Sequence, residues 1–172
     1  AKAIIQLNKP NNGSVKFEGR ELVGLSTAAM RPIRRKMGMV FQDPYGSLNP
    51  RMTVGSILSE GPRIHQMGKE NEIRDRIEHL MDRCGLDPVN HINRYPHEFS
   101  GGQRQRVTIA RALVNRPAIV WADEPTGDLD SETASEIVEL IQDLNRSNGQ
   151  TFVVVTHSIE VGQRANRIVN MR

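Results

Sequence analysis

One short polar segment places two adjacent glycines directly before an amphipathic pattern. It runs from Phe99 to Arg106 and reads Phe-Ser-Gly-Gly-Gln-Arg-Gln-Arg. The pattern predicts a glycine turn that opens a helix, where unpaired backbone N–H groups point outward at the positive end. Such an end can bind an anion, and Gly101 and Gly102 would let a phosphate approach the backbone closely. Taken alone, the segment is more simply explained as an ordinary helix N-cap at Ser100.

Two adjacent carboxylates follow a short apolar run. Asp123 and Glu124 come directly after residues 119–122, which read Ile-Val-Trp-Ala. This run predicts a buried parallel strand, and ligands of open α/β sheets bind at the carboxyl edge of such strands. There, one acid can hold a hydrated Mg²⁺ while the other polarises an attacking water. A solvated strand end would explain an isolated Asp-Glu pair as well.

Two other strand-like runs each deliver a polar side chain to the same predicted edge. His157 follows the β-branched run 151–156, and Gln42 follows the apolar run 37–41. A histidine there can hydrogen-bond a terminal phosphate or a water, and the glutamine amide can reach Mg²⁺ or water. Each residue alone has an ordinary interpretation as a cap or surface group. Polar groups at successive strand ends are much harder to explain as coincidence.

The elements that must position these groups alternate between strands and helices. We expect strands at 37–41, 118–122 and 151–156, a helix capped by Ser26 and another helix over 131–146. This order predicts a parallel sheet covered on both faces. A helix-rich middle, roughly 43–100, interrupts the alternation as an inserted subdomain, with helices over 53–66 and 71–84 and a loop over 43–52. We also expect the tail of a helix over 1–8 and a final strand over 167–171.

The bulk properties fit a single globular domain. The 172 residues are 37% hydrophobic and 25% charged, and no apolar run reaches the length of a membrane span. Cys84 is the only cysteine, which excludes an internal disulfide. The histidines lack metal-ligand spacing, so a zinc site is not expected. The basic cluster over 31–36 is interpreted as a solvated helix face, and no nucleic-acid partner is expected.

Together these residues resemble the motifs of ABC ATPases, in the order that the family has them. The segment 99–103 resembles the signature motif, and 119–124 resembles the Walker B strand. Gln42 matches the Q-loop, 127–130 the D-loop and His157 the switch histidine. The resemblance covers essentially the whole chain. It implies a P-loop NTPase-like α/β fold with a mostly parallel sheet, in which 1–42 and 101–172 form the catalytic core and 43–100 the helical subdomain.

The resemblance also implies a role for each motif residue in ATP hydrolysis. Asp123 and Gln42 would serve Mg²⁺, Glu124 would be the general base, and His157 and Gln42 would complete the catalytic set. The remaining residues would clamp ATP that is held mainly by a second ABC ATPase domain, identical or related: Ser100, Gly101, Gly102, Gln103 and Asp130. The opening segment would therefore be one half of a composite site.

One motif of the family has no match. The chain contains no Gly-x-x-x-x-Gly-Lys-Ser/Thr loop, the Walker A motif that cradles phosphates. In this family that loop lies just before the helix whose tail we expect at 1–8. We therefore expect a longer parent protein, and weak ATP binding and hydrolysis by residues 1–172 alone.

Different segments point to different subfamilies. Residues 41–54 and 95–99 resemble oligopeptide and dipeptide importers, whereas 123–130 is closer to lipoprotein-release and macrolide-export ATPases. The importer resemblance implies a cytoplasmic subunit on the inner face of the membrane. It would contact permease subunits through the Q-loop and helical subdomain, with Tyr45, Leu48 and Met52 as groove candidates. A soluble ABC ATPase, such as the methanogen protein implicated in reductase activation, is the alternative from another class.

Overall fold

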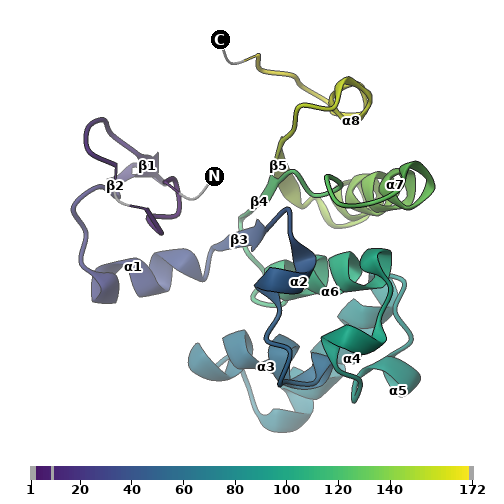
Figure 1. Cartoon of the computed structure of the whole chain (residues 1–172). Coiled ribbons are helices and arrows are strands. Elements are labelled where there is room, and N and C mark those ends of the chain that lie inside the picture. The colour runs from purple at the N-terminus through teal and green to yellow at the C-terminus, as the bar shows by residue number, and fades with distance from the viewer. Residues whose placement is uncertain (1–2, 9, 171–172) are drawn as a thin grey trace.

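A parallel sheet forms the centre of the computed structural model, which describes residues 3–8 and 10–170 (Figure 1). Within these ranges the sheet has three strands, β3 (Met37–Val40), β4 (Ile119–Asp123) and β5 (Thr151–Val155), in that spatial order. A separate antiparallel hairpin joins β1 (Lys16–Phe17) to β2 (Arg20–Glu21). The α/β class and the parallel sheet are therefore as predicted.

Helices connect the strands and fill the segment between β3 and β4. The longer ones are α1 (Thr27–Arg34), α3 (Val54–Ile64), α4 (Glu70–Arg83), α6 (Gly101–Leu113) and α7 (Ser131–Asn148). The shorter ones are α2 (Pro44–Ser47), α5 (Pro88–His91), the 3₁₀ turn η1 (Pro96–Glu98) and α8 (Ile159–Gln163). None of the helices in the described ranges combines the length and apolarity needed to cross a membrane.

The helix α2 lies in the segment 43–52 that is predicted to be a loop, and α5 lies in a segment for which no element is predicted. Each begins with an aspartate cap followed by a proline at the first helical position. Asp43 accepts a hydrogen bond from the Gly46 N–H at 3.0 Å, and Asp87 accepts one from the Val89 N–H at 2.9 Å. The Asp-Pro pair is a helix-start signal that could have been recognised.

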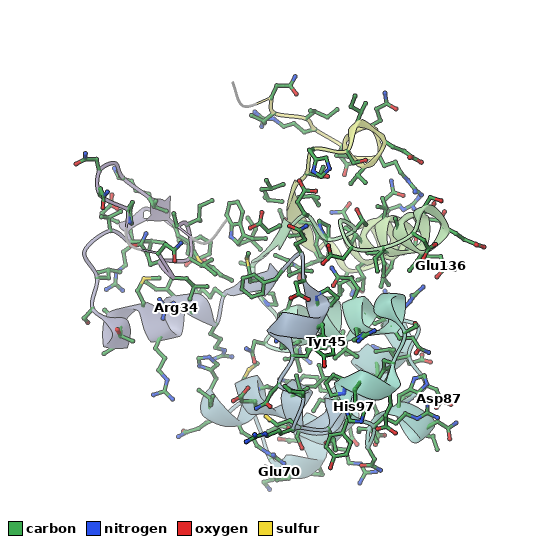
Figure 2. All side chains as sticks on the ribbon, viewed as in Figure 1. Arg34, Tyr45, Glu70, Asp87, His97 and Glu136 are labelled. Carbon is green, nitrogen blue, oxygen red and sulfur yellow. The ribbon has the colours of Figure 1, made fainter. Side chains whose placement is uncertain are left out.

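Two predicted elements at the ends of the chain are wrong over the residues that the structure describes. Residues 3–8 form a turn and a bend instead of a helix tail, with a Gln6 φ of 55°. The Arg34 guanidinium donates hydrogen bonds to the carbonyl oxygens of Ile5 and Gln6 at 3.2 and 2.8 Å (Figure 2). In a helix, backbone N–H groups would have donated to these carbonyls instead.

No strand forms over 167–170, the described part of the strand predicted over 167–171, and Met171 lies outside the described residues. Ile168 and Val169 are exposed by 57% and 72%. A β-branched run needs a neighbouring strand edge to pair with. In Figure 1 the chain leaves the sheet after β5, and the segment after α8 runs away from it.

Alternate residues of the strands face two separate hydrophobic clusters. Val120 and Ala122 pack with α6 and α7, whereas Ile119 and Trp121 pack on the side of α1 and the hairpin. This period of two is the geometry of a strand covered on both faces. The larger cluster continues into α3 and α4, so the helical segment 43–100 packs against the sheet through α6.

The α6 helix lies unusually close to β3. A Cβ atom added to Gly38 would stand 2.6 Å from the Ala112 carbonyl oxygen. Only glycine permits this approach, which sets the distance between the end of α6 and the beginning of β3.

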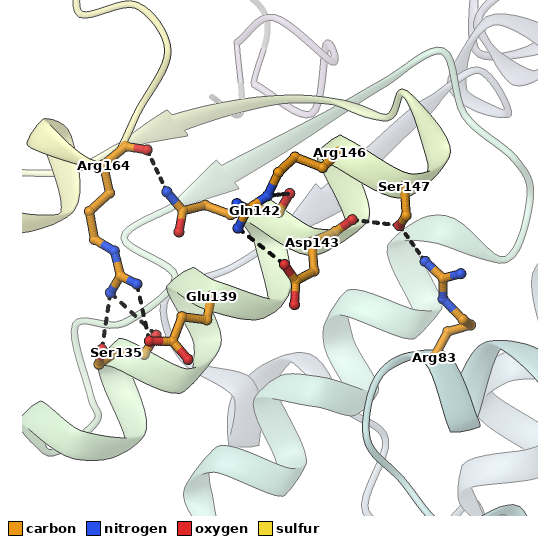
Figure 3. Close-up of polar contacts among 8 residues, drawn as sticks. All are labelled: Arg83, Ser135, Glu139, Gln142, Asp143, Arg146, Ser147 and Arg164. Carbon is orange, nitrogen blue, oxygen red and sulfur yellow. Dashed lines mark hydrogen bonds and ion pairs between the residues drawn. The ribbon is translucent and has the colours of Figure 1, made fainter.

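Polar side chains hold α7 on two sides (Figure 3). Arg83 at the end of α4 donates to the Asn148 amide oxygen at 3.2 Å. On the other side, Arg164 donates to the Ser135 hydroxyl at 3.0 Å, and Gln142 donates to the Arg164 carbonyl at 2.8 Å. These bonds tie α7 to the helical segment and to the chain after α8.

Candidate active site

The predicted catalytic residues follow three parallel strands at their carboxyl ends. The register pairs Val40 with Ala122 and Asp123 with Val155. Counting forward, Gln42 is level with Glu124, and His157 lies just beyond the end of β5. The parallel pairing therefore delivers all of these residues to one edge of the sheet, as expected for a ligand site of an open α/β sheet.

Glu124 is the most highly organised side chain at this edge. Its Oε1 atom lies 2.9 Å from His157 Nδ1 and accepts the His157 backbone N–H at 2.8 Å. Its Oε2 atom accepts the Thr156 hydroxyl at 3.0 Å. The Glu124 backbone has a φ of 47° and its N–H donates to the Val155 carbonyl at 2.8 Å. Glu124 is thus bound to the end of β5 through both backbone and side chain.

These contacts set the charge of the carboxyl. Burial opposes ionisation of Glu124, but hydrogen bonds from His157 and Thr156 outweigh it and hold its pKa below the ordinary value. An ionised carboxylate can only accept hydrogen bonds, so His157 Nδ1 carries the donated proton. The other ring nitrogen, Nε2, then remains available to a substrate, and the His157 side chain is 85% exposed.

Thr156 is a site residue that the sequence analysis did not identify. The sequence predicts it only as the last residue of a strand, whereas in the structure it supplies one of the hydrogen bonds to Glu124. Its position directly before a strand-end histidine was the available signal.

Asp123 and Gln42 offer oxygen donors at neighbouring strand ends. No group of three or more metal-ligating side chains (His, Cys, Asp or Glu) occurs in the described ranges. That donor set suits Mg²⁺, which proteins usually hold through one or two carboxylates together with substrate phosphates. Gln42 is exposed, and its amide packs beside Gly127, where an added Cβ would lie 3.1 Å from Gln42 Nε2.

The predicted phosphate turn is a capped helix start. Gln103 N–H donates to the Ser100 hydroxyl at 3.2 Å, and Ser100 N–H donates to the Gln103 amide oxygen at 3.1 Å. This reciprocal capping box leaves the N–H groups of Gly101 and Gly102 without an acceptor within the helix. Both interpretations of the segment are thus compatible, because the cap orients the turn without using these two donors.

The start of α7 lies against this turn. A Cβ atom added to Gly102 would stand 2.5 Å from the Thr133 methyl group, and one added to Gly101 would stand 3.4 Å from Leu129. Asp130 caps α7 by accepting the Thr133 N–H at 3.0 Å, a bond that also holds the pKa of Asp130 below its ordinary value. Among the described residues, no hydrogen bond joins Ser100, Gln103 or Asp130 to Glu124 or His157.

The candidate groove residues behave differently from one another. Tyr45 is 57% exposed and lies 5.4 Å from the Arg104 guanidinium, whereas Met52 packs partly buried against the core (Figure 2). Leu48 is only 2% exposed, so its prediction as a groove residue is wrong. The loop folds back after α2 and places this side chain in the core with α3 and α6.

Comparison with known proteins identifies the family. Residues 1–127 match the family model described as ABC transporter. The oligopeptide transport ATP-binding protein OppF of Escherichia coli is 44% identical over 162 residues, which are 94% of this chain and 48% of OppF. The glutathione import ATP-binding protein GsiA of Pectobacterium atrosepticum is 41% identical over 168 residues, 98% of this chain and 27% of GsiA. The chain thus spans about half the length of OppF and about a quarter of the length of GsiA.

Solved structures agree with these relatives. The dimeric structure of MJ0796, a bacterial ABC transporter cassette, superposes with a TM-score of 0.82 at 37% identity, covering 95% of this chain and 70% of that one. A post-hydrolysis dimer of the same cassette, bound to ADP and Pi, matches equally well. The sequence relatives confirm the likeness to oligopeptide importers, and the solved structures confirm the likeness to ABC cassettes. The chain therefore belongs to the ABC transporter family.

Proposed function

We propose that this chain forms the ATP-hydrolysing cassette of a peptide-type ABC importer. The observation that carries the proposal is the Glu124 carboxylate, which is ionised, oriented by His157 and Thr156, and placed beside Asp123 at the ligand edge of the sheet. The importer class rests on the likeness to OppF and GsiA.

In this mechanism Glu124 orients and polarises the attacking water. Phosphoryl transfer depends mainly on positioning and charge, so an ionised carboxylate that accepts a proton from water is sufficient. His157 bonds Glu124 through Nδ1 and turns Nε2 toward the γ-phosphate. Bound Mg²⁺ would neutralise charge on the phosphate oxygens, and Asp123 and Gln42 would hold it.

The capped turn at 100–103 would bind the γ-phosphate of ATP held by a second ABC domain. The free N–H groups of Gly101 and Gly102 and the Ser100 hydroxyl supply the donors, and Gln103 supports them through the capping box. Asp130 orients the start of α7 beside this turn. The proposal is supported by the likeness to a dimeric cassette.

The partners that we propose are a second ATPase domain and membrane permease subunits. The permease would dock on the loop after Gln42 and on the helices of 43–100, which form the proposed helical subdomain, with Tyr45 exposed for contact. This arrangement would place the chain on the inner face of the membrane. Co-purification of the full-length protein with a permease tests this assignment against a soluble ABC ATPase.

The decisive experiment for hydrolysis is Glu124→Gln in the full-length protein. We expect phosphate release to fall by roughly 10²–10⁴-fold while ATP binding, measured by calorimetry, is retained. Glu78→Gln is the matched control, because Glu78 pairs with Arg74 on the surface of α4 at 2.7 Å, away from the strand ends. Wild-type hydrolysis rates in Glu124→Gln would refute the proposed role of Glu124.

A further inference from the structure

A buried glutamine on α6 contacts both backbone segments that carry the candidate catalytic residues. Gln105 has no exposed surface. Its Nε2 atom donates to the Pro125 carbonyl at 2.5 Å and makes a longer contact of 3.5 Å with the Phe41 carbonyl. Phe41 precedes Gln42 directly, and Pro125 follows Glu124 directly. One side chain therefore touches the backbone beside both residues.

The orientation of the Gln105 amide is determined by its other partner. The Thr108 hydroxyl, also fully buried, shares its single proton between Gln105 Oε1 at 3.1 Å and the Gln105 carbonyl at 2.8 Å. Because Oε1 accepts there, the amide NH₂ must face the two carbonyls, and it has two protons to donate. Complete burial means that no water can take over these bonds if the amide is removed.

The backbone that Gln105 holds is unusual. Glu124 adopts a left-handed φ of 47°, a conformation that persists only where surrounding contacts enforce it. Its carbonyl accepts the Gly127 N–H at 3.1 Å, which closes a turn around Pro125. The bond from Gln105 to Pro125 fixes this turn against α6, the helix that begins with the capped turn at 100–103.

We propose that Gln105 is a positioning residue for hydrolysis, which holds Glu124 and Gln42 in a fixed relation to the capped turn at 100–103. Gln105 lies about one helical turn after the start of α6. Binding of a partner's nucleotide there would act on the same rigid helix that touches the backbone at Phe41 and Pro125. The inference rests on the proposed ATPase function, and it concerns residues that do not contact nucleotide themselves.

The first test is Gln105→Met in the full-length protein, which keeps the length and burial of the side chain but removes both donors. We expect kcat for ATP hydrolysis to fall roughly 10- to 100-fold, because small displacements of catalytic groups have effects of that size. The KM for ATP should stay within about twofold, since no nucleotide contact is removed. A rise in KM at unchanged kcat would overturn the proposal.

A merely structural role is tested by two further variants. Ser59→Ala removes another buried side-chain hydrogen bond, at 3.0 Å to the Ser56 carbonyl within α3, and should leave kcat unchanged. Gln105→Glu keeps the shape, and burial favours the protonated carboxyl, which can donate to Pro125. Its kcat relative to wild type should therefore rise as the pH is lowered, whereas that of Gln105→Met should not. Absence of this rescue would contradict the positioning role.

Hydrogen exchange separates this inference from the function on which it rests. The amides of Glu124 and Gly127 should exchange faster in Gln105→Met than in the wild type or Ser59→Ala, independent of any activity. If the wild type hydrolyses no ATP but the amides of Glu124 and Gly127 still exchange faster in Gln105→Met, the ATPase proposal fails. The contact of Gln105 with the backbone beside Glu124 is then still supported. Unchanged exchange together with unchanged kcat would refute the inference. If Gln105→Met does not fold, Gln105→Glu carries both measurements.

Discussion

At the scale of single residues, the site depends on how the Glu124 carboxylate is held. Each of its oxygens has a defined partner, and these partners favour the charged form over the effect of burial. A carboxylate with a low pKa is a weak base in solution, but it is always ionised at neutral pH and fixed in direction. Orientation is the larger contribution to phosphoryl transfer.

Removing the Thr156 hydroxyl should therefore change the pH dependence. Thr156→Val takes away a donor to the ionised form, so the pKa of Glu124 rises and the acid limb of the kcat/KM profile moves to higher pH. The same shift reduces the stability that ionised Glu124 contributes at neutral pH, a contribution that is lost as the pH falls through the pKa of the folded protein. Thr156→Ser, which keeps the hydroxyl, is the control, and identical profiles for both variants would contradict this account.

At the scale of elements, the distance between α6 and β3 is set by one glycine. Gly38 lets the Ala112 carbonyl approach the strand, and the same close packing brings Gln105 within reach of the Phe41 and Pro125 carbonyls. A larger residue would have to push a helix backbone away, which no rotamer change can relieve.

We therefore expect Gly38→Ala to lower the free energy of unfolding by about 1–3 kcal/mol, measured by urea denaturation, and to reduce hydrolysis as α6 shifts. Gly162→Ala is the matched control, because a Cβ there meets nothing within 4 Å. As an open position in α8, it should be neutral or stabilising by up to about 1 kcal/mol. Equal effects of the two substitutions would show that close packing at Gly38 is not the cause.

At the scale of the whole molecule, the described residues hold two groups of functional side chains that do not bond each other. One lies at the strand ends around Glu124, and the other lies at the starts of α6 and α7 around Ser100 and Asp130. This separation is what a composite site between two copies or two related domains requires.

Ser100→Arg in the full-length protein tests that arrangement. It should leave ATP binding within one subunit unchanged but abolish hydrolysis, because the long cationic side chain fills the space of the partner's γ-phosphate. In a Glu124→Gln background, ATP should trap a dimer detectable by size-exclusion chromatography with light scattering, and Ser100→Arg should prevent it. Asn71→Arg adds the same charge to an exposed position of α4 and should not. Dimer formation with Ser100→Arg would contradict the composite site.

Local patterns predicted much of this structure correctly. The strands β3, β4 and β5 and the helix starts at Ser26 and Ser100 follow from apolar runs and capping residues that act within a few positions. The short helices α2 and α5 were missed although their Asp-Pro starts are local signals. The two errors at the chain ends depend on distant contacts that are either made or absent. At the N-terminal end, Arg34 donates to the carbonyls of Ile5 and Gln6, where a helix tail is predicted. At the C-terminal end, the run at 168–170 has no strand edge to pair with, where a strand is predicted.

The sequence by itself determined which chemical groups this chain carries and that each catalytic candidate follows a strand. Hydrophobic periodicity and helix capping are local, so they can be recognised along the chain. Only the tertiary structure decided that Thr156 and His157 bind Glu124, and that Gln105 joins the backbone beside Gln42 to that beside Glu124. These contacts depend on strand register and on the distance between a helix and the sheet, which are fixed only when the whole core packs.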